Sequence, residues 1–201
     1  MSFICADGET GELVDILPSR KLDKIIPYFN RSPLEKREKV KFLVTDMNAA
    51  YFQLTKNVFP TAKLIIDRFH IVKHLNTAFN DFRVREMKRL ITNKKKSKAN
   101  KLKSNWKLLL KNQTNISISE FKTWRSFPSP KYHLLTESMV IDRLLSFSSE
   151  LKEAYDIFHL LMYHFRNKDD RSFFELLKNL PDSLDTQFRD KIENLISYEE
   201  G

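Results

Sequence analysis

The stretch that decides the fold of this chain runs over residues 40–46 and reads Val-Lys-Phe-Leu-Val-Thr-Asp. Its β-branched and aromatic residues predict a buried strand, because the only charge before the final aspartate is Lys41. Asp46 then stands at the end of that strand, at the sheet edge where α/β folds place their ligands. The residues that follow, 47–54, predict a helix. From its position alone Asp46 is more readily a helix N-cap, the role that Asp often takes, and it is also a candidate metal ligand.

Further strands and a helix are expected on both sides of this stretch. Two short apolar runs, residues 2–6 and 12–17, enclose the sequence Asp-Gly-Glu-Thr-Gly, which predicts an antiparallel hairpin. An amphipathic helix is expected over residues 21–30 and another buried strand over residues 62–66. Because consecutive β-α-β units imply parallel pairing, the first half of the chain is expected to form a mixed sheet.

The remainder of the chain is expected to be helical. A long helix is predicted over about residues 68–90, and apolar residues recur at helical spacing after residue 105. The lysine-rich residues 93–104 between them have poor apolar periodicity and are expected to form a loop or a frayed segment. The predicted fold class is α/β, with a partial mixed-sheet core over residues 1–90 and a basic segment with an all-helical region over residues 91–201.

Composition excludes several classes of protein. The 201 residues include only 3 Gly and no Gly-rich phosphate loop, and the single Cys5 excludes a disulfide framework and a cysteine zinc site. One cysteine fits a reducing, cytoplasmic setting. No apolar run reaches the roughly 20 residues that cross a bilayer, and the start of the chain has no signal-peptide pattern. A membrane partner is therefore not expected.

Positive charge is concentrated in one segment. The net charge is +9, yet residues 83–111 carry twelve Lys or Arg against one acidic residue, Glu86, which leaves the rest of the chain at −2. A dense patch of one sign that also carries Trp106 is typical of contact with a phosphate backbone, although a solvated basic surface has the same composition. The candidate DNA-contacting residues are Arg85, Lys88, Arg89, Lys94, Lys95, Lys96, Lys98, Lys101 and Lys103.

A second carboxylate repeats the position of Asp46. Asp67 follows the expected strand over residues 62–66 and opens the run Asp-Arg-Phe-His, which ends at His70. Parallel neighbouring strands would bring both carboxylates to one edge, where they could share a divalent cation, or each could simply cap its helix. His70 and His74 share a helix face, but the His-Glu-x-x-His zinc pattern is absent, so His70 is expected to orient substrate or to bond backbone.

These residues resemble the DDE transposases of bacterial insertion sequences, in particular the ISL-three-like group. The resemblance rests on Leu-Val-Thr-Asp-Met at residues 43–47, Ile-Asp-Arg-Phe-His-Ile-Val-Lys at residues 66–73 and Asp-Ile-Leu-Pro-Ser-Arg at residues 15–20. It covers residues 2–90 strongly and the helical remainder more loosely. It implies a ribonuclease-H-like fold interrupted by a helical insertion. It also implies an Asp-Asp-Glu triad that holds two Mg²⁺ ions for DNA strand cleavage and strand transfer.

Position by position, the resemblance makes Asp46 the second catalytic aspartate and a metal ligand, and it places Asp67, Arg68 and His70 near the site. The family's first aspartate lies on a strand before residues 2–6, and its glutamate follows the helical insertion. The chain is therefore expected to be truncated at both ends and inactive alone, with weak or absent Mg²⁺ binding. The implied partners are DNA and either a second copy of the chain or full-length transposase protomers.

Two other functions remain open at this point. A non-catalytic DNA-binding module would use the basic segment alone, and its binding would depend on salt without requiring Mg²⁺. A small Mg²⁺-dependent nuclease would instead use Asp7, Asp46 and Asp67 as a compact site.

Overall fold

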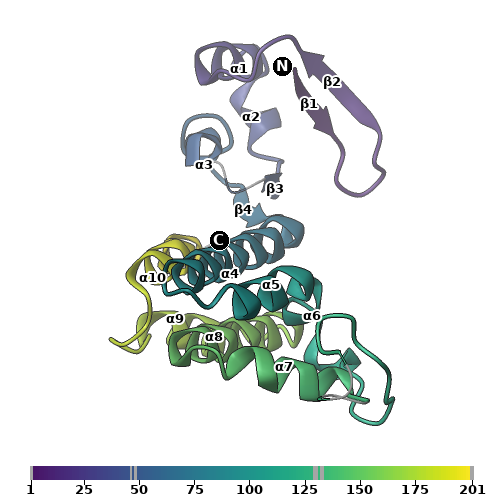
Figure 1. Ribbon diagram of the computed structural model, residues 1–201. Coiled ribbons are helices and arrows are strands. Elements are labelled where there is room, and N and C mark those ends of the chain that lie inside the picture. Colours follow the sequence, from purple (N-terminus) through teal and green to yellow (C-terminus); the bar gives the residue numbers. More distant parts are fainter. Residues whose placement is uncertain (1, 46, 48, 129–130, 132–133, 200–201) are drawn as a thin grey trace. The chain divides into compact units, whose positions relative to one another are not determined.

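The computed structural model of the protein describes residues 2–45, 47, 49–128, 131 and 134–199 (Figure 1). Packing divides these residues into two units, one that extends to Ile71 and one over residues 72–199. The boundary at residue 90 expected from the sequence separates a mixed β/α first half from a helical second half. It stays a prediction.

The first unit contains four short strands in two separate pairs. The strands are β1 (Phe3–Ala6), β2 (Leu13–Leu17), β3 (Phe42–Thr45) and β4 (Lys63–Ile66). The predicted hairpin is confirmed, since β1 and β2 pair antiparallel, and β3 and β4 pair parallel as the β-α-β order predicts. Among the described residues no ladder joins the two pairs, so the expected mixed sheet is present there as two two-stranded sheets.

The hairpin turn is held by one carboxylate. Asp7 Oδ1 accepts hydrogen bonds from the backbone N–H groups of Thr10 at 2.7 Å and Glu9 at 3.0 Å. Gly11 follows with φ at +72°, a conformation that glycine adopts without the steric cost that a Cβ atom brings. The sequence of the turn therefore determines its geometry locally, which is why it could be predicted.

Three further helices belong to the first unit: α1 (Leu22–Phe29), α2 (Leu34–Arg37) and α3 (Ala49–Asn57). Two of them, α1 and α3, pack against its strands. Ile25 of α1 and Leu54 of α3 form the core with Leu17 of β2, and Leu43 of β3 packs against it.

The opposite side of β3 is open, which corrects the prediction of a strand buried on both faces. Phe42 is 57% exposed and Val44 is 59% exposed. Because side chains alternate along a strand, a sheet covered on one side buries only every second residue.

The second unit is a helical bundle built around α4, which begins in the first unit. Its helices are α4 (Arg68–Thr92), α5 (Lys96–Ser104), α6 (Trp106–Leu109), α7 (Glu137–Leu145), α8 (Ser149–Arg166), α9 (Asp170–Lys178) and α10 (Thr186–Glu193), with 3-10 turns at Gln113–Asn115 and Asn194–Tyr198. Phe79 of α4 stacks on Phe158 of α8 with ring centroids 4.8 Å apart, and Phe188 of α10 packs edge-on against Phe79. The long helix predicted over residues 68–90 is confirmed.

Two expectations for this half of the chain are wrong. The lysine-rich stretch is not a loop, because residues 96–104 form α5 with Ala99 and Leu102 buried one turn apart. The described residues within 116–135 are not helical, and two isolated bridges, Lys122 with Leu135 and Trp124 with Phe127, organise them instead. Tertiary contacts override the weak local pattern in both places. No helix in the described part of the chain is long and apolar enough to cross a membrane.

Candidate functional site

The first candidate site is the edge where β3 and β4 end. Asp46 lies outside the described residues, so its role as a catalytic metal ligand stays a prediction. Thr45, the residue before it, pairs with Ile66, and the N–H of Asp67 donates to the carbonyl oxygen of Thr45 at 2.9 Å. The register of the parallel pair therefore ends both strands at the same edge, as the sequence predicted.

Asp67 caps helix α4. Its Oδ1 accepts a hydrogen bond from the N–H of Phe69 at 2.9 Å, which satisfies a backbone donor in the first turn of the helix. Its Oδ2 lies 3.3 Å from Nδ1 of His70 without hydrogen-bond geometry, so the two form an ion pair only when the imidazole is protonated. Arg68 begins the helix and is exposed. His74 Nε2 instead bonds the carbonyl oxygen of Lys191 at 2.6 Å, which favours a structural role over a shared zinc site with His70.

The described residues at this edge do not by themselves fit a two-metal site. No group of three His, Cys, Asp or Glu side chains within the described part of the chain could hold a metal ion. Asp7, which a compact nuclease site would need, is engaged in the hairpin turn. The hydrogen bonds from the N–H groups of Thr10 and then Glu9 lower the pKa of Asp7.

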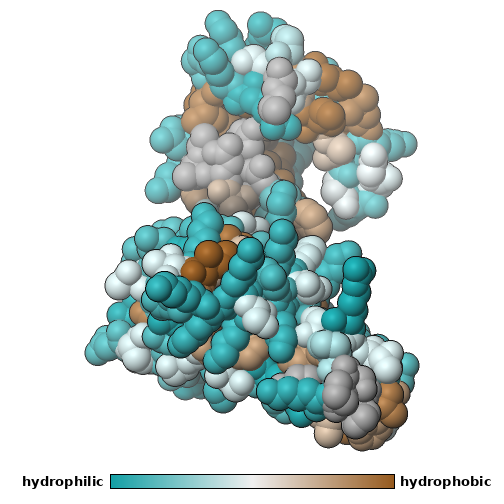
Figure 2. Space-filling view, in the orientation of Figure 1, coloured by the Kyte–Doolittle hydropathy of each residue, from teal (hydrophilic) through white to brown (hydrophobic). Residues whose placement is uncertain are grey.

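The second candidate site is a basic cavity of about 1060 Å³ in the helical unit. It lies between α5 and the segment over residues 124–126. Its cationic, aromatic and amide side chains are Lys96, Lys101, Lys103, Arg125, Trp124, Asn100 and Asn105. Figure 2 shows that the face of this unit turned to the viewer is mostly hydrophilic.

The spacing of residues along α5 produces one side of the basic cavity. Lys96, Asn100 and Lys103 follow one another at i, i+4 and i+7, which places them on one face of a helix. The buried Ala99 and Leu102 lie on the other face and hold α5 on the bundle. The helix contains no acidic residue, so no carboxylate of α5 itself offsets the positive charge of its lysines.

A buried asparagine connects the other side of the basic cavity to α5. The Nδ2 of Asn105 donates to the carbonyl oxygen of Lys101 at 2.7 Å and to Oγ of Ser126 at 3.0 Å. Lys101 also lies over the ring of Phe127, with its Nζ 4.5 Å from the centroid. These contacts hold Arg125 next to the lysines of α5. Sequence reasoning missed Arg125, because only the tertiary fold brings it to that helix.

The remaining predicted lysines lie outside the basic cavity. Lys94 occupies the turn between α4 and α5 with φ at +59°, and the N–H of Lys95 donates to the carbonyl oxygen of Leu90 at 2.8 Å. This is the hydrogen bond that closes a helix C-terminus in a Schellman motif. Lys98 lies 5.2 Å from the ring centroid of Phe147. Lys88 is exposed on α4.

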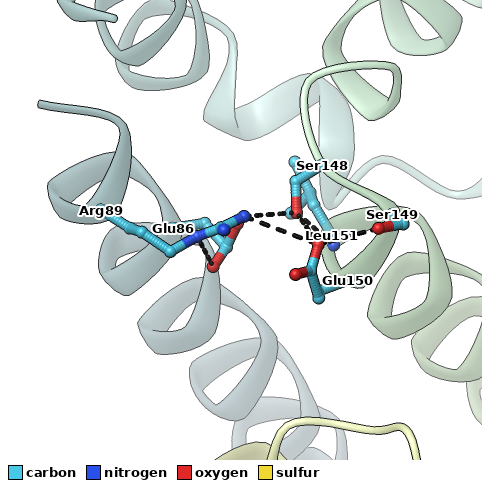
Figure 3. Close-up of polar contacts among 6 residues, drawn as sticks. All are labelled: Glu86, Arg89, Ser148, Ser149, Glu150 and Leu151. Carbon is cyan, nitrogen blue, oxygen red and sulfur yellow. Dashed lines mark hydrogen bonds and ion pairs between the residues drawn. The ribbon is translucent and has the colours of Figure 1, made fainter. Parts of the chain in front are cut away.

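The two predicted arginines are bound to carboxylates of the helical unit. Arg85 forms an ion pair with Asp185. Arg89 contacts Glu86 at 2.7 Å and Glu150 at 3.5 Å, which connects α4 to the start of α8 (Figure 3). The hydrogen bonds that Arg89 donates to the carboxylate of Glu86, opposed by partial burial, raise the pKa of Arg89. Their role in DNA contact remains untested, and the structure gives each of them a bundle-stabilising role.

Comparison of the sequence with models of known protein families identifies the family of the chain. A family model described as transposase, for DDE enzymes of the ISL3 group, matches residues 1–201. Comparisons with curated proteins and with solved structures give no match. The family match agrees with the resemblance carried by residues 43–47 and 66–73. It also agrees with the parallel pairing of β3 and β4. The chain belongs to the DDE transposase family of the ISL3 group.

Proposed function

We propose that this chain acts in DNA transposition in the cytoplasm and holds DNA on the basic cavity. Four cationic side chains, those of Lys96, Lys101, Lys103 and Arg125, converge on one concave surface in a member of a transposase family. This convergence is the observation that carries the proposal. Lysine and arginine neutralise backbone phosphates and release condensed counterions, which drives sequence-independent binding to DNA.

The aromatic residue of the basic cavity favours DNA over a small anion. Trp124 is held by a hydrogen bond from its Nε1 to the carbonyl oxygen of Leu135 at 2.9 Å, so its ring is fixed in place. Lys122 lies over that ring, with its Nζ 5.0 Å from the centroid. A fixed ring beside several cations suits a nucleotide chain, which presents phosphates and stacking bases together.

The second part of the proposal concerns chemistry at the strand edge. We assign Asp46 as a ligand of the Mg²⁺ ions that DNA strand cleavage and strand transfer would use, with Asp67, Arg68 and His70 beside it. Two-metal catalysis needs several carboxylates in fixed geometry. The 201-residue chain is accordingly proposed to bind DNA without cutting it. Assembly with a second copy or with longer transposase protomers stays a prediction.

Binding of a short fluorescent DNA duplex, followed by anisotropy at several salt concentrations, tests the first part. The double variant Lys96→Gln/Lys103→Gln should bind at least tenfold more weakly. The slope of log K against log salt concentration should become shallower by about 1.8, since each lost phosphate contact removes roughly 0.9. The matched control is Lys152→Gln/Lys178→Gln, which removes the same charge from exposed lysines paired with Asp156 and Glu199. Equal losses in both variants, or binding that ignores salt, would contradict the proposal.

Incubation of the same duplex with the chain and Mg²⁺ tests the second part. We expect intact DNA in the presence and absence of the metal. Cleavage that disappears in Asp46→Ala would show that the chain is active alone and would favour the nuclease reading. Failure of the DNA-binding test and failure of the cleavage test are independent of each other, because the two sites lie on different elements.

A further inference from the structure

The buried side chain of Arg83 carries an inference about how the basic cavity is held in shape. Arg83 lies on α4 and is 6% exposed. Its Nε and Nη2 donate hydrogen bonds to Oδ1 of Asn80, one turn earlier on α4, at 3.0 and 2.9 Å. Its Nη1 donates to the carbonyl oxygen of Leu102 of α5 at 3.2 Å. The guanidinium group therefore connects α4 to the last turn of α5.

Both acceptors of Arg83 are neutral, although the guanidinium group is charged. The carboxylate of Glu86, one turn further along α4, is bound by Arg89. Among the described residues no carboxylate forms an ion pair with Arg83, and burial lowers its pKa. Removing a cation from water costs free energy, and an apolar side chain of similar volume is often as stabilising in such a place. Packing alone therefore does not explain an arginine at this position.

Arginine adds direction to the contact between the two helices. Its planar guanidinium group holds the donors in a fixed fork, so the groups that accept from it are fixed relative to one another. The carbonyl of Leu102 is one of the last four in α5, which have no partner within the helix. By binding this backbone atom, Arg83 restrains both the place of the last turn and the rotation of α5 about its axis.

Helix α5 depends on such restraints. It has nine residues, and isolated helices shorter than about 12–15 residues are marginal in water. Lys95, at its N-cap position, makes no capping hydrogen bond with its side chain, and the residues of α5 that are buried are Ala99 and Leu102. The lysines of the helix also repel one another, because like charges on one helix destabilise it.

The rotation of α5 decides where its lysines point. Successive residues of a helix are about 100° apart around the axis, so a rotation by a fraction of a turn moves a whole face. Lys96, Asn100 and Lys103 form the face that lines the basic cavity. Their place at the cavity therefore depends on what holds the backbone of α5.

We propose that Arg83 is a positioning residue of the basic cavity, which holds the last turn of α5 on α4 and thereby directs Lys96 and Lys103 at the phosphates of DNA. This inference rests on the proposed binding of DNA at that cavity. Because Arg83 is buried, it acts through the two lysines and contacts no phosphate itself.

Two substitutions of Arg83 test this role, with the fluorescent duplex and the salt titration described above. Arg83→Lys keeps the charge but replaces the planar fork with one rotatable ammonium group, and Arg83→Met removes the charge and the donors. We expect both variants to bind DNA about tenfold more weakly, with a slope of log K against log salt concentration that is shallower by up to about 1.8. A residue that only stabilises the fold would leave the slope of the folded chain unchanged.

A combined variant identifies the residues through which Arg83 acts. In a chain that already carries Lys96→Gln/Lys103→Gln, Arg83→Lys should weaken binding by less than about twofold, because the two phosphate contacts are already lost. The matched control is Lys191→Met, which removes a cation that joins α10 to α4 through Asp81. It should bind DNA as the parent chain does.

Amide hydrogen exchange separates a local effect on α5 from a general loss of stability. In Arg83→Lys the amides of α5 should exchange about tenfold faster than in the parent chain, whereas those in the middle of α8 should keep their protection. Urea unfolding of the same variant gives the folded fraction that enters the DNA titration.

Three results would overturn the inference: binding by Arg83→Lys equal to that of the parent, additive losses in the combined variant, or equal acceleration of exchange in α5 and α8. If the Arg83 variants do not fold, Asn80→Ala decides the question. It removes the acceptor of two of the three hydrogen bonds at a partly buried position, and unchanged binding would refute the positioning role. Binding by Lys96→Gln/Lys103→Gln equal to that of the parent would instead contradict the proposed function, so the two failures are distinct.

Discussion

The buried imidazole of His159 should make the stability of the helical unit depend on pH. The residue is 4% exposed in the core of α8, and its Nε2 lies 3.0 Å from the carbonyl oxygen of Leu109. Since a carbonyl only accepts, Nε2 carries the proton of the neutral ring. Burial lowers the pKa of His159 to about 4, against a smaller raising effect of the bond to Leu109. Arg166 lowers that pKa further, and Asp156 raises it.

The sign and size of the effect follow from linkage. In the unfolded chain the imidazole titrates near about 6.5, so between that pH and about 4 the unfolded state binds more protons than the native state. The stabilisation that comes from the neutral His159 is therefore fully present above the pKa of the unfolded chain. It is lost as the pH falls toward the pKa of the folded chain. At a pH of about 4.5 the calculated loss is about 2.5 kcal/mol, from a slope of about 1.4 kcal/mol per pH unit.

Urea unfolding at pH values of about 7.5 and 4.5 measures this loss. The variant His159→Gln is the control, because its amide can still donate to Leu109 and does not titrate. We expect the parent chain to lose about 2.5 kcal/mol and the variant to lose far less. Hydrogen bonds and nearby charge lower the pKa of the carboxylates of Glu150 and Asp169, whose stabilisation is lost mainly below this window. Equal losses in both chains would refute the reasoning.

Two further predictions concern packing and backbone conformation. Phe79→Ala removes the ring stacked on Phe158 and should lower the free energy of unfolding, measured in urea titrations, by about 3–5 kcal/mol. The control Phe69→Ala, at a 65% exposed position, should change that free energy by less than about 0.5 kcal/mol. A small effect at Phe79 would mean that the core repacks. Lys94→Gly should raise the free energy of unfolding by about 1 kcal/mol, because glycine adopts the observed φ of +59° without the Cβ clash. Lys95→Gly, at a position whose φ of −96° ordinary residues adopt without strain, should bring no gain. A gain at both positions would point to a general effect of lost charge.

Part of the candidate site could be predicted because its chemistry is local. The run that ends at Asp67 determined both the parallel pairing of β4 and the helix that follows, and the structure confirms both. The sequence predicted either a helix cap or a metal ligand at Asp67, and the structure shows the cap. The partial ribonuclease-H-like sheet remains a prediction, because the described strands form two pairs.

The basic segment shows where local information ends. Nothing in the local sequence distinguishes Arg85 and Arg89 from the neighbouring lysines, yet the fold places a carboxylate of α8 and the N-cap carboxylate of α10 against them. Lys96 and Lys103 are left on the outer face of α5, since Ala99 and Leu102 determine which face is buried. Only two apolar residues in nine determine that face, too few to produce a recognisable periodicity in advance.

The sequence by itself determined the elements whose information lies within a few residues: the hairpin with its Asp-Gly turn, the parallel β3–β4 pair and the long helix α4. It also determined the family through the strand-end aspartates and the Asp-Arg-Phe-His run. Tertiary structure alone decided that Arg125 joins the lysines of α5 and that Arg83 binds the backbone of that helix. Both depend on contacts between residues far apart in the chain, whose free energy exists only once the surrounding elements have packed.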